Sequence, residues 1–490
     1  MEPTKALTIF LIGLSTLIRF SLCRENHFSP SLPTGHYEKA LLRLDHLKTS
    51  IKVASPSPFT STPSPGENKA GVFLPTSYGA DPTGKSDSTE AILKAIQDAT
   101  RIPTKKRHLM PGVTDLGGAR IDLQGGNYLI NHPLRLPATG FGNLVIHGGT
   151  IRASENFPPN AYLIDLSETS NKGKQTQKAS PNPSQYNYEY ITLKDLLLDS
   201  NFKGGGISII NSLRISIQNC YITHFTTNGI QVQGGHETFI HNTFLGQHIT
   251  AGGDPDERSF SGTGITLAGN DNVVTDVVVF SASVGIMLSG EANTISGVHC
   301  YNKATSFGGT GIYLKLPGFT QTRIVHSYMD YTSIVAEDPV QLHISSSFFL
   351  GDANVVLKSK NGVVNGVNIV NNMFSGSNSG VDIVHLDQSN GPFRQIDQVL
   401  VDGNMVNGMN VKTTVARASS KGNGTSWTVD FNKVLLFPNL IRHVQYSLCS
   451  SDNTFPQSVL RNMSHNRVVV ETNKVVQAHV YVTVNQCSDI

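Results

Sequence analysis

One short pattern of apolar and polar residues recurs along the middle of the chain. Its copies read GGGISII, TNGIQVQ, GTGITLA, SVGIMLS, GTGIYLK, TSIVAED, ANVVLKS, SGVDIVH and NGMNVKT. The apolar residues that lead these copies are Ile207, Ile230, Ile265, Ile286, Ile312, Ile334, Val355, Val381 and Met409. Consecutive leads lie 21 to 28 residues apart, except for a step of 35 residues between Ile230 and Ile265. A second β-branched run lies between copies, and Gly, Asn, Asp and Ser separate the runs.

A repeat of this length, with several short strands in each copy, is typical of a parallel β-helix. One copy cannot bury its own apolar face, so successive coils must stack about 4.8 Å apart. The leucine-rich repeat has a similar period, but its fixed leucine and asparagine spacing is missing here. We therefore predict an all-β fold, a right-handed parallel β-helix, over residues 71–420.

Different patterns flank the repeat. The stretch SDSTEAILKAIQDAT predicts a helix over residues 88–100, begun by a capping-box-like Asp87 and Glu90. Its apolar stripe is Ile92, Ala95, Ile96 and Ala99. We expect this helix to cap the N-terminal end of the solenoid, where an open strand edge invites aggregation. Period-two alternation predicts a small antiparallel β module over residues 421–490, which either covers the C-terminal end or binds glycan.

The N-terminal region carries a targeting pattern. Residues 1–23 combine Lys5 with a short apolar run and small residues, which indicates a secretory signal peptide. The run is shorter than the roughly 20 apolar residues of a membrane span. A helix-like stretch and a Ser/Thr/Pro-rich linker fill residues 24–70. We expect a secreted, extracellular protein with no membrane contact in its mature form.

Export makes disulfides and glycosylation possible. Cys449 and Cys487 lie close together in sequence and are the expected disulfide, whereas Cys220 and Cys300 lie in apolar strands and are expected to be buried thiols. Asn423 and Asn462 begin glycosylation sequons. The formal net charge of +2 is too small to indicate nucleic-acid binding, but it permits a local basic cleft for an acidic polymer.

Four segments together resemble a known family. YGADPTGKSDSTEAILKAIQDA looks like the opening of pectate-lyase-like β-helix proteins, and FLGQHITAGGDPDERSFSGTGI, HCYNKATSFGGTGIYLK and VAEDPVQL are similar to the quartet-type plant polygalacturonases. That group is a divergent branch near glycoside hydrolase family 28. The resemblance implies a hydrolase that cleaves α-1,4-linked galacturonan of pectin (homogalacturonan) in the plant cell wall. It also implies a role in pollen mother cell wall breakdown.

The catalytic motifs of the main branch do not carry over. Main-branch enzymes place Asn-Thr-Asp, Asp-Asp and Gly-His-Gly at strand starts on consecutive coils. The corresponding positions here are Asn228, Thr263, Val284 and Thr310. Gly-Gly-His236 falls after its strand, and only Lys315 resembles a main-branch residue, the lysine that binds substrate carboxylate.

The long step between Ile230 and Ile265 contains an acidic insertion. Glycoside hydrolysis needs two carboxyl groups, roughly 6.5 to 9.5 Å apart for inversion. Asp254, Asp256 and Glu257 are candidate acid and base, and Arg258 is a candidate bidentate ligand for a uronate carboxylate. The alternative is a solvated surface loop.

A second set of candidates lies farther along the chain. Glu337 and Asp338 occupy the end of a repeat strand and are candidate catalytic carboxylates, although Asp338-Pro339 is equally consistent with a tight turn. Tyr313 and Lys315 fall on one strand face and form a candidate substrate-binding pair. Asp330 lies between tyrosines that can stack on sugars. His299 is a less favoured substitute for the missing histidine, and Asp271 and Asp276 are more typical of turn ladders.

Two other functions stay open. A lyase of this fold would use Arg258, Arg323 or Lys315 as base, with calcium held by the acidic insertion. A non-catalytic pectin-binding solenoid would explain the missing aspartates. The hydrolase itself is expected to need neither a cofactor nor a metal.

Overall fold

The computed structural model describes residues 71–101, 107–137, 139–167, 186–248, 260–302, 307–451 and 453–487. Lys69–Ile490 form one compact unit. The predicted signal peptide and linker lie outside the described residues, as do Asp254, Asp256, Glu257 and Arg258 of the acidic insertion. Among the helices of the described ranges, none is long and apolar enough to cross a membrane.

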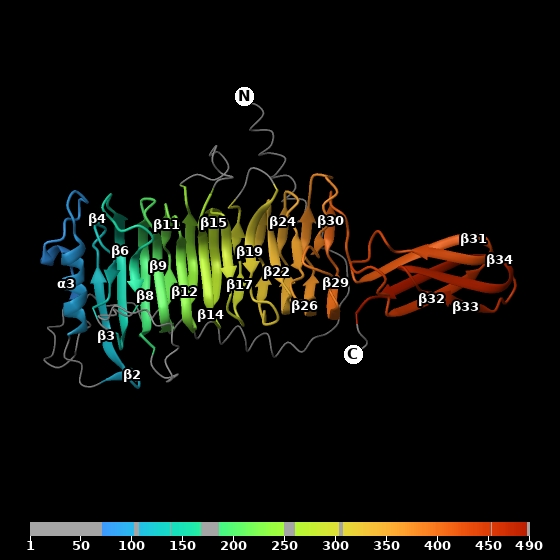
Figure 1. The fold of residues 1–490 in the computed structure, drawn as a ribbon, viewed down its shortest axis with the longest axis horizontal. Helices are drawn as coiled ribbons and strands as arrows, with labels where there is room; N and C mark the ends of the chain where they lie inside the picture. The colour runs from blue at the N-terminus through green and yellow to red at the C-terminus, as the bar shows by residue number, and fades with distance from the viewer. Residues whose placement is uncertain are drawn as a thin grey trace, which may run out of the picture. The chain divides into compact units, whose positions relative to one another are not determined.

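The repeat forms coils of parallel strands that stack in three columns (Figure 1). The first strand column consists of β5 (Leu134–Arg135), β7 (Tyr162–Leu166), β9 (Gly205–Leu213), β12 (Asn228–His236), β14 (Thr263–Asn270), β16 (Val284–Leu288), β19 (Gly309–Leu314), β22 (Thr332–Glu337), β25 (Val355–Lys358) and β28 (Val384–Asp387). This all-β solenoid confirms the predicted fold.

The other two columns share several long strands. The second strand column consists of β1 (Val72–Phe73), β3 (Val113–Asp122), β6 (Phe141–Ala153), β8 (Tyr188–Asp199), β10 (Ser216–Gln218), β13 (Phe239–Gly246), β15 (Val273–Ser281), β17 (Thr294–Ser296), β20 (Arg323–Val325), β23 (Val340–Ser345), β26 (Val363–Val370) and β29 (Gln395–Asp402). The third strand column contains β4 (Asn127–Ile130), the last residues of β6, β8, β13 and β15, and β11 (Tyr221–Thr223), β18 (His299–Cys300), β21 (Tyr328–Asp330), β24 (Phe348–Leu350), β27 (Met373–Ser375) and β30 (Met405–Asn407). A short strand, β2 (His108–Met110), pairs antiparallel with β3.

The corner between the second and third columns is made by residues in the left-handed region. Seven of them have φ between 49° and 56°: Asp195, Asn219, Asn242, Asp276, His326, Ser346 and Asn371. Asn and Asp tolerate this conformation better than most residues. Their side chains also join neighbouring coils, since the Asn219 amide donates to Asp195 at 2.7 Å. Asp276 therefore has the turn role that its context indicates.

The predicted core register is correct over most of the first column. Ile207, Ile230, Ile265, Ile286, Ile312, Ile334 and Val355 are paired from coil to coil and fully buried. The next lead is wrong, because Val355 pairs with Val384 rather than Val381. The run VDIVHL holds two overlapping apolar alternations, and the later one continues the ladder.

Glycine precedes several lead residues because the coils approach closely there. A Cβ on Gly264 would lie 2.6 Å from the carbonyl oxygen of Gly285, and one on Gly285 would lie 2.4 Å from that of Gly311. Real Cβ atoms do not come so near a backbone oxygen. The Gly-Ile signature of the repeat is therefore a consequence of stacking.

Helix α3 (Thr89–Thr100) lies at the N-terminal end of the stacked strands (Figure 1). It buries the predicted stripe of Ile92, Ala95, Ile96 and Ala99, and it follows a short 3₁₀ turn, η1 (Pro75–Tyr78). The predicted capping box does not form. Asp87 instead accepts hydrogen bonds from the backbone N–H groups of Thr89 and Asn131, which ties the helix start to the solenoid.

The C-terminal residues form an antiparallel sheet of β31 (Val415–Asp430), β32 (His443–Ser450), β33 (Ser458–Asn462) and β34 (Arg467–Asn485). It has its own apolar cluster around Trp427 and Phe431. Between β31 and β32, Leu436 and Phe437 join the core of the solenoid instead. Asn423 and Asn462, the predicted glycosylation sites, are both exposed.

The predicted disulfide between Cys449 and Cys487 is wrong, because both thiols are free. Cys449 lies opposite His479 in the sheet, and Cys487 follows His479 by eight residues. At about 3.3 Å per residue the two cysteines lie far beyond the roughly 7 Å Cα limit of a disulfide. Cys220 and Cys300 are buried free thiols, as predicted.

Candidate active site

Charged side chains occupy one register position on consecutive coils of the first strand column. Glu337 at the end of β22 pairs with Lys358 of β25, which pairs with Asp387 of β28. Lys315 follows β19 and precedes Glu337 by one coil, because Leu314 pairs with Ala336. The residues that precede them pack into the core, so these four side chains point outward: Leu314, Ala336, Leu357 and Leu386. We call Lys315, Glu337, Lys358 and Asp387 the charged ladder.

Glu337 is held by a tyrosine from the preceding coil. The Tyr313 hydroxyl donates to Glu337 Oε1 at 2.6 Å, and Lys360 Nζ lies 4.0 Å from the same oxygen. Burial, followed by the hydrogen bond and charge of Glu337, raises the pKa of Tyr313 to about 12. The Glu337 side chain is only 4% exposed. This carboxyl group is therefore shielded from water and fixed in place.

Asp387 is more open than Glu337. Hydrogen bonds from the side chain and backbone N–H of Ser389 lower the pKa of Asp387, and the nearby Lys358 and His385 act in the same direction, while burial opposes them. Lys358 Nζ lies 4.0 Å from Asp387 Oδ2. Asp387 is therefore ionised at the pH of most enzyme reactions.

A pocket of about 340 Å³ includes residues of β25 and β28, the strands that end in Lys358 and Asp387. It is lined by Phe307, Ser333, Asn354, Val356, Gly380, Val381, Asp382 and His385. His385 lies two residues before Asp387 on β28 and is exposed. Sugar rings placed along the ladder would thus find an apolar wall, amide and hydroxyl groups, and a histidine beside the carboxylates.

A family model described as rhamnogalacturonase A/epimerase, pectate lyase-like, matches residues 75–310. The protein named polygalacturonase QRT3 of Arabidopsis thaliana is 58% identical over 489 residues, which are 98% of each chain. The chain belongs to the quartet-type polygalacturonase family.

Two solved structures with low sequence identity also match. The tailspike protein of Escherichia coli bacteriophage HK620 is 10% identical, with coverage of 84% of this chain and 93% of that chain and a TM-score of 0.44. The surface adhesin PfbA of Streptococcus pneumoniae is 13% identical, with coverage of 69% and 98% and a TM-score of 0.42.

Within this quartet-type family member, the positions of the main-branch motifs lack catalytic groups. Asn228, Thr263, Val284 and Thr310 pair in one register, as the sequence predicts. None of the four carries an acid or a histidine. His236 lies at the end of β12, where its Nε2 contacts the Tyr186 hydroxyl at 2.7 Å. The charged ladder lies at another register position, at the other end of each short strand.

Asp338 has the second of its two predicted roles, the turn. It is 1% exposed, and its carboxylate accepts hydrogen bonds from the backbone N–H groups of Lys360, Asn361, Gly362 and Val363 at 2.6 to 3.3 Å. Both oxygens are occupied by backbone donors. We therefore leave Asp338 out of the candidate site.

Asp330 and His299 lie in the third strand column rather than beside the ladder. The ring of His299 stacks on that of Tyr328 with centroids 4.3 Å apart, and burial lowers the pKa of His299. Burial also raises the pKa of Asp330. The structure thus brings together Tyr313, Lys315 and Glu337 of the predicted site. Asp330 and His299 lie apart from these three residues.

The acidic insertion starts and ends at one aromatic cluster. The rings of His248, before it, and Phe260, after it, stack with centroids 5.1 Å apart. Phe202 packs against His248 and His224, and His224 Nδ1 lies 2.7 Å from Asp199. This cluster leads into β14, three coils before β22. Three coils correspond to about 14 Å along the solenoid.

Sequence reasoning missed Asp387, Lys358 and Lys360. The signal was present, since the ends of IVAE, VVLK and VHLD align once Val384 is taken as the lead residue. The choice of Val381 moved Asp387 out of the ladder. In the part of the chain that the structure describes, no three His, Cys, Asp or Glu side chains are arranged to hold a metal ion.

Proposed function

We propose that this protein is a secreted polygalacturonase that hydrolyses α-1,4-linked galacturonan in cell-wall pectin. The observation that carries the proposal is the pairing of Glu337 and Asp387 across one intervening lysine, in a chain 58% identical to polygalacturonase QRT3. Two strand spacings separate the backbone positions of these acids by about 9.6 Å. This is close to the roughly 6.5 to 9.5 Å separation of inverting glycosidases.

The two carboxyl groups have different surroundings and are given different roles. Asp387 is the base, because its lowered pKa keeps it ready to accept a proton from water. Glu337 is the acid, because its carboxyl group is only 4% exposed and lies across Lys358 from the base; it takes up a proton before each turnover. Glu337 gives its proton to the glycosidic oxygen while the water oxygen, losing its proton to Asp387, bonds to the anomeric carbon as the glycosidic bond breaks.

The cations of the site suit a polyanionic substrate. Lys315 is exposed, and the Lys358 and Lys360 side chains are 28% and 43% exposed. Each ammonium group can pair with the carboxylate of a galacturonate unit. A few local cations are enough for this purpose, and the chain as a whole remains near neutral.

The acidic insertion is a second proposed source of carboxylates. Asp254, Asp256 and Glu257 would act as acid and base and Arg258 would bind a uronate, as the sequence suggests. The aromatic cluster of Phe202, His248 and Phe260 supports this alternative, because aromatic rings at the base of the insertion can contact sugars. Signal-peptide export and a role in pollen mother cell wall breakdown are also parts of the proposal.

The decisive experiment uses purified protein and polygalacturonate. Hydrolysis predicts new reducing ends without ultraviolet absorbance, and it predicts indifference to chelators. A lyase would give an absorbing unsaturated product and depend on calcium, and a binding protein would never shorten the polymer. Loss of activity in Glu337→Gln and Asp387→Asn, with activity kept in Asp254→Asn and Asp256→Asn, supports the ladder. The reverse pattern would assign catalysis to the insertion.

A further inference from the structure

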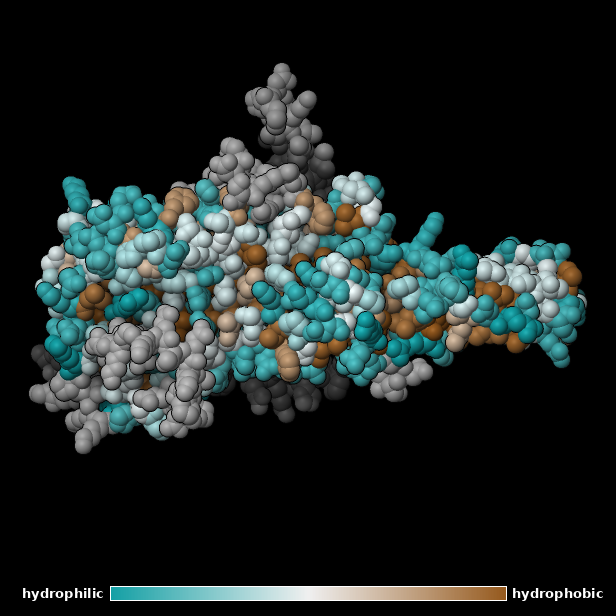
Figure 2. Space-filling view, viewed as in Figure 1, coloured by the Kyte–Doolittle hydropathy of each residue, from teal (hydrophilic) through white to brown (hydrophobic). Residues whose placement is uncertain are grey.

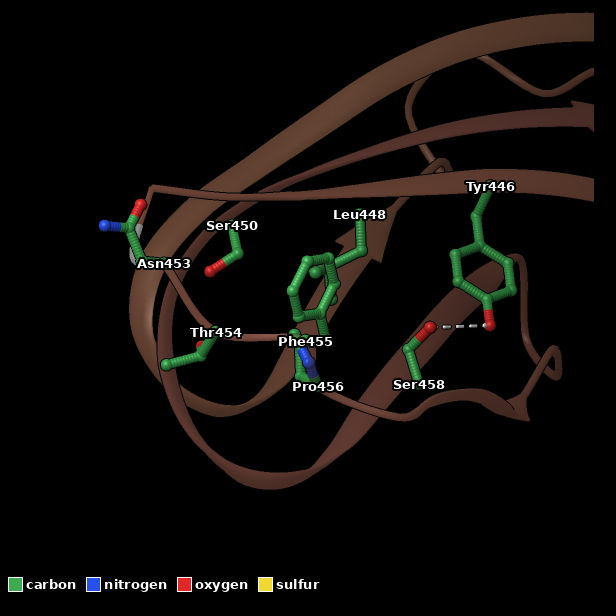
Figure 3. Close-up of a pocket in the computed structure, with 8 residues that line it drawn as sticks. All are labelled: Tyr446, Leu448, Ser450, Asn453, Thr454, Phe455, Pro456 and Ser458. Atoms are coloured by element: carbon green, nitrogen blue, oxygen red, sulfur yellow. Dashed lines mark hydrogen bonds between the residues drawn. The ribbon is translucent and has the colours of Figure 1, made fainter.

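The C-terminal sheet contains a pocket of its own, shown in Figure 3. Its volume is about 820 Å³, within the range of about 300 to 1,000 Å³ typical of ligand sites. It is lined by Tyr446, Leu448, Ser450, Asn453, Thr454, Phe455, Pro456 and Ser458. None of these residues belongs to the charged ladder. The pocket is therefore a site separate from the proposed hydrolysis.

The path of the chain explains why the sheet opens here. The long strand β34 pairs with β33 at Val469–Thr472 and with β32 at Ala478–Asn485. Between these two stretches Asn473 is bonded to Gln457 and Gln477 to Ser451, so the chain between β32 and β33 leaves the strand pairing there and returns to it. Tyr446, Leu448 and Ser450 alternate along β32 and thus share one face. The connection to β33 carries Asn453 to Pro456 across the opening. Strand and loop together make the walls.

Phe455 stands out among the wall residues. It is 97% exposed, although burial of an aromatic side chain is normally favourable. Figure 3 shows the Tyr446 hydroxyl and the Ser458 hydroxyl on the same pocket wall, joined by a hydrogen bond of 3.3 Å. In the same view as Figure 1, hydrophobic residues appear among hydrophilic ones on the surface of this sheet (Figure 2). An exposed ring beside hydroxyl and amide groups has the chemistry of a sugar-stacking platform.

The charge of the lining selects among sugars. All eight lining residues are uncharged. The ladder, by contrast, offers Lys315, Lys358 and Lys360 to uronate groups. A polyuronate would leave its carboxylates without cationic partners in the pocket, whereas a neutral sugar would lose nothing there.

We propose that this pocket binds a neutral glycan, with one sugar ring stacked on Phe455 and its hydroxyl groups hydrogen-bonded to Asn453 and Thr454. The ligand class is a neutral polysaccharide chain, distinct from the anionic substrate of the solenoid. Such a site would hold the protein on a wall surface while the solenoid contacts pectin. Binding at the pocket is independent of whether the ladder is catalytic.

The test is affinity electrophoresis of the full-length secreted protein in gels that contain galactan, arabinan, xyloglucan or polygalacturonate. We expect at least one neutral polymer to retard the protein, and Phe455→Ala to weaken that binding by about tenfold or more. Phe319→Ala is the matched control, since Phe319 is 64% exposed and belongs to the solenoid. Hydrolysis of soluble polygalacturonate should be the same in Phe455→Ala and in the parent protein.

Several outcomes would overturn the proposal. They are the absence of retardation by every neutral polymer, equal retardation of Phe455→Ala and the parent protein, and loss of retardation only in gels that contain polygalacturonate. Analytical sedimentation of the same variants tests whether the protein self-associates through this pocket. If Phe455→Ala converts a dimer to a monomer and changes no glycan binding, the pocket is an interface between copies of this chain.

Discussion

Glu337 and Asp387 occupy the same register position of the first strand column, two coils apart, with Lys358 between them. Each acid faces a different partner, since Glu337 accepts from Tyr313 and Asp387 from Ser389. The regular stack thus places the backbones of these two acids two strand spacings, or about 9.6 Å, apart.

Removal of either acid should abolish most of the activity without unfolding the protein. General acid or base catalysis contributes on the order of a hundredfold to ten-thousandfold, so we expect kcat to fall by at least a hundredfold in Glu337→Gln and in Asp387→Asn. Reducing-end assays on polygalacturonate measure this change. Asp330→Asn is the control, and its activity should remain near that of the parent. Unchanged kcat in both ladder variants would exclude the proposed roles.

Loss of a ladder lysine should affect substrate binding more than the chemical step. A charged hydrogen bond is worth about 1.5–3 kcal/mol, so we expect Lys358→Ala to raise KM for polygalacturonate by roughly tenfold. The effect should shrink as ionic strength rises, because exposed charges are screened. Steady-state kinetics at low and high salt test this. Lys421→Ala, an exposed lysine in β31, serves as the comparison.

The pH profile should respond to Ser389. Its side chain and N–H lower the pKa of Asp387 below the ordinary value of 3.8, so the acidic limb of kcat/KM should lie below that pH. In Ser389→Ala the pKa of Asp387 rises, and the limb moves to higher pH. The stability of the protein depends on pH in the same direction. The lowered pKa of Asp387 stabilises the folded state at pH values above the pKa of Asp387 in the unfolded chain. This contribution is lost as the pH falls through the pKa of Asp387 in the folded state. A limb that stays in place would mean that another group titrates.

Asp338 should matter for stability and not for catalysis. Its carboxylate accepts four backbone N–H groups from residues 360–363, and these donors would lose their partner in Asp338→Ala. Unsatisfied buried groups cost about 1–3 kcal/mol each, so a fall of several degrees in Tm is expected. Thermal denaturation gives the measurement. A variant with normal Tm and no activity would return Asp338 to the list of catalytic candidates.

The described cysteines should remain reduced and differ in reactivity. Burial raises the pKa values of Cys220 and Cys300 to about 12, which leaves almost no thiolate at neutral pH. Cys449 is exposed and should react rapidly with a thiol reagent. Thiol titration before and after unfolding checks this, and reductant should not change Tm. A Tm that drops in reductant would point to a disulfide.

The sequence was sufficient for the coil register where lead residues had a single apolar alternation, as at Ile286 and Ile312. It failed at Val381, because VDIVHL offers two alternations and only the neighbouring coils select Val384. The same slip hid Asp387. The disulfide prediction failed for a different reason. Cys449 lies near the end of β32, and β34 runs antiparallel to β32 and carries Cys487 past the start of that strand, so the two cysteines are close in sequence but far apart in space. Local pattern predicts strands well, but contacts between strands need the third dimension.

The residues that follow the last strand also determine where the protein can be truncated. Gln486 donates to the carbonyl of Phe437, and the Cys487 thiol donates to that of Val399, so these two residues are bonded to the solenoid. A protein truncated at residue 420 would lose Leu436 and Phe437 and leave its final coil uncovered. Such a fragment would expose unpaired backbone N–H and C=O groups at the end of the solenoid, which can pair with strands of other molecules. Expression of the solenoid alone is therefore expected to give insoluble material.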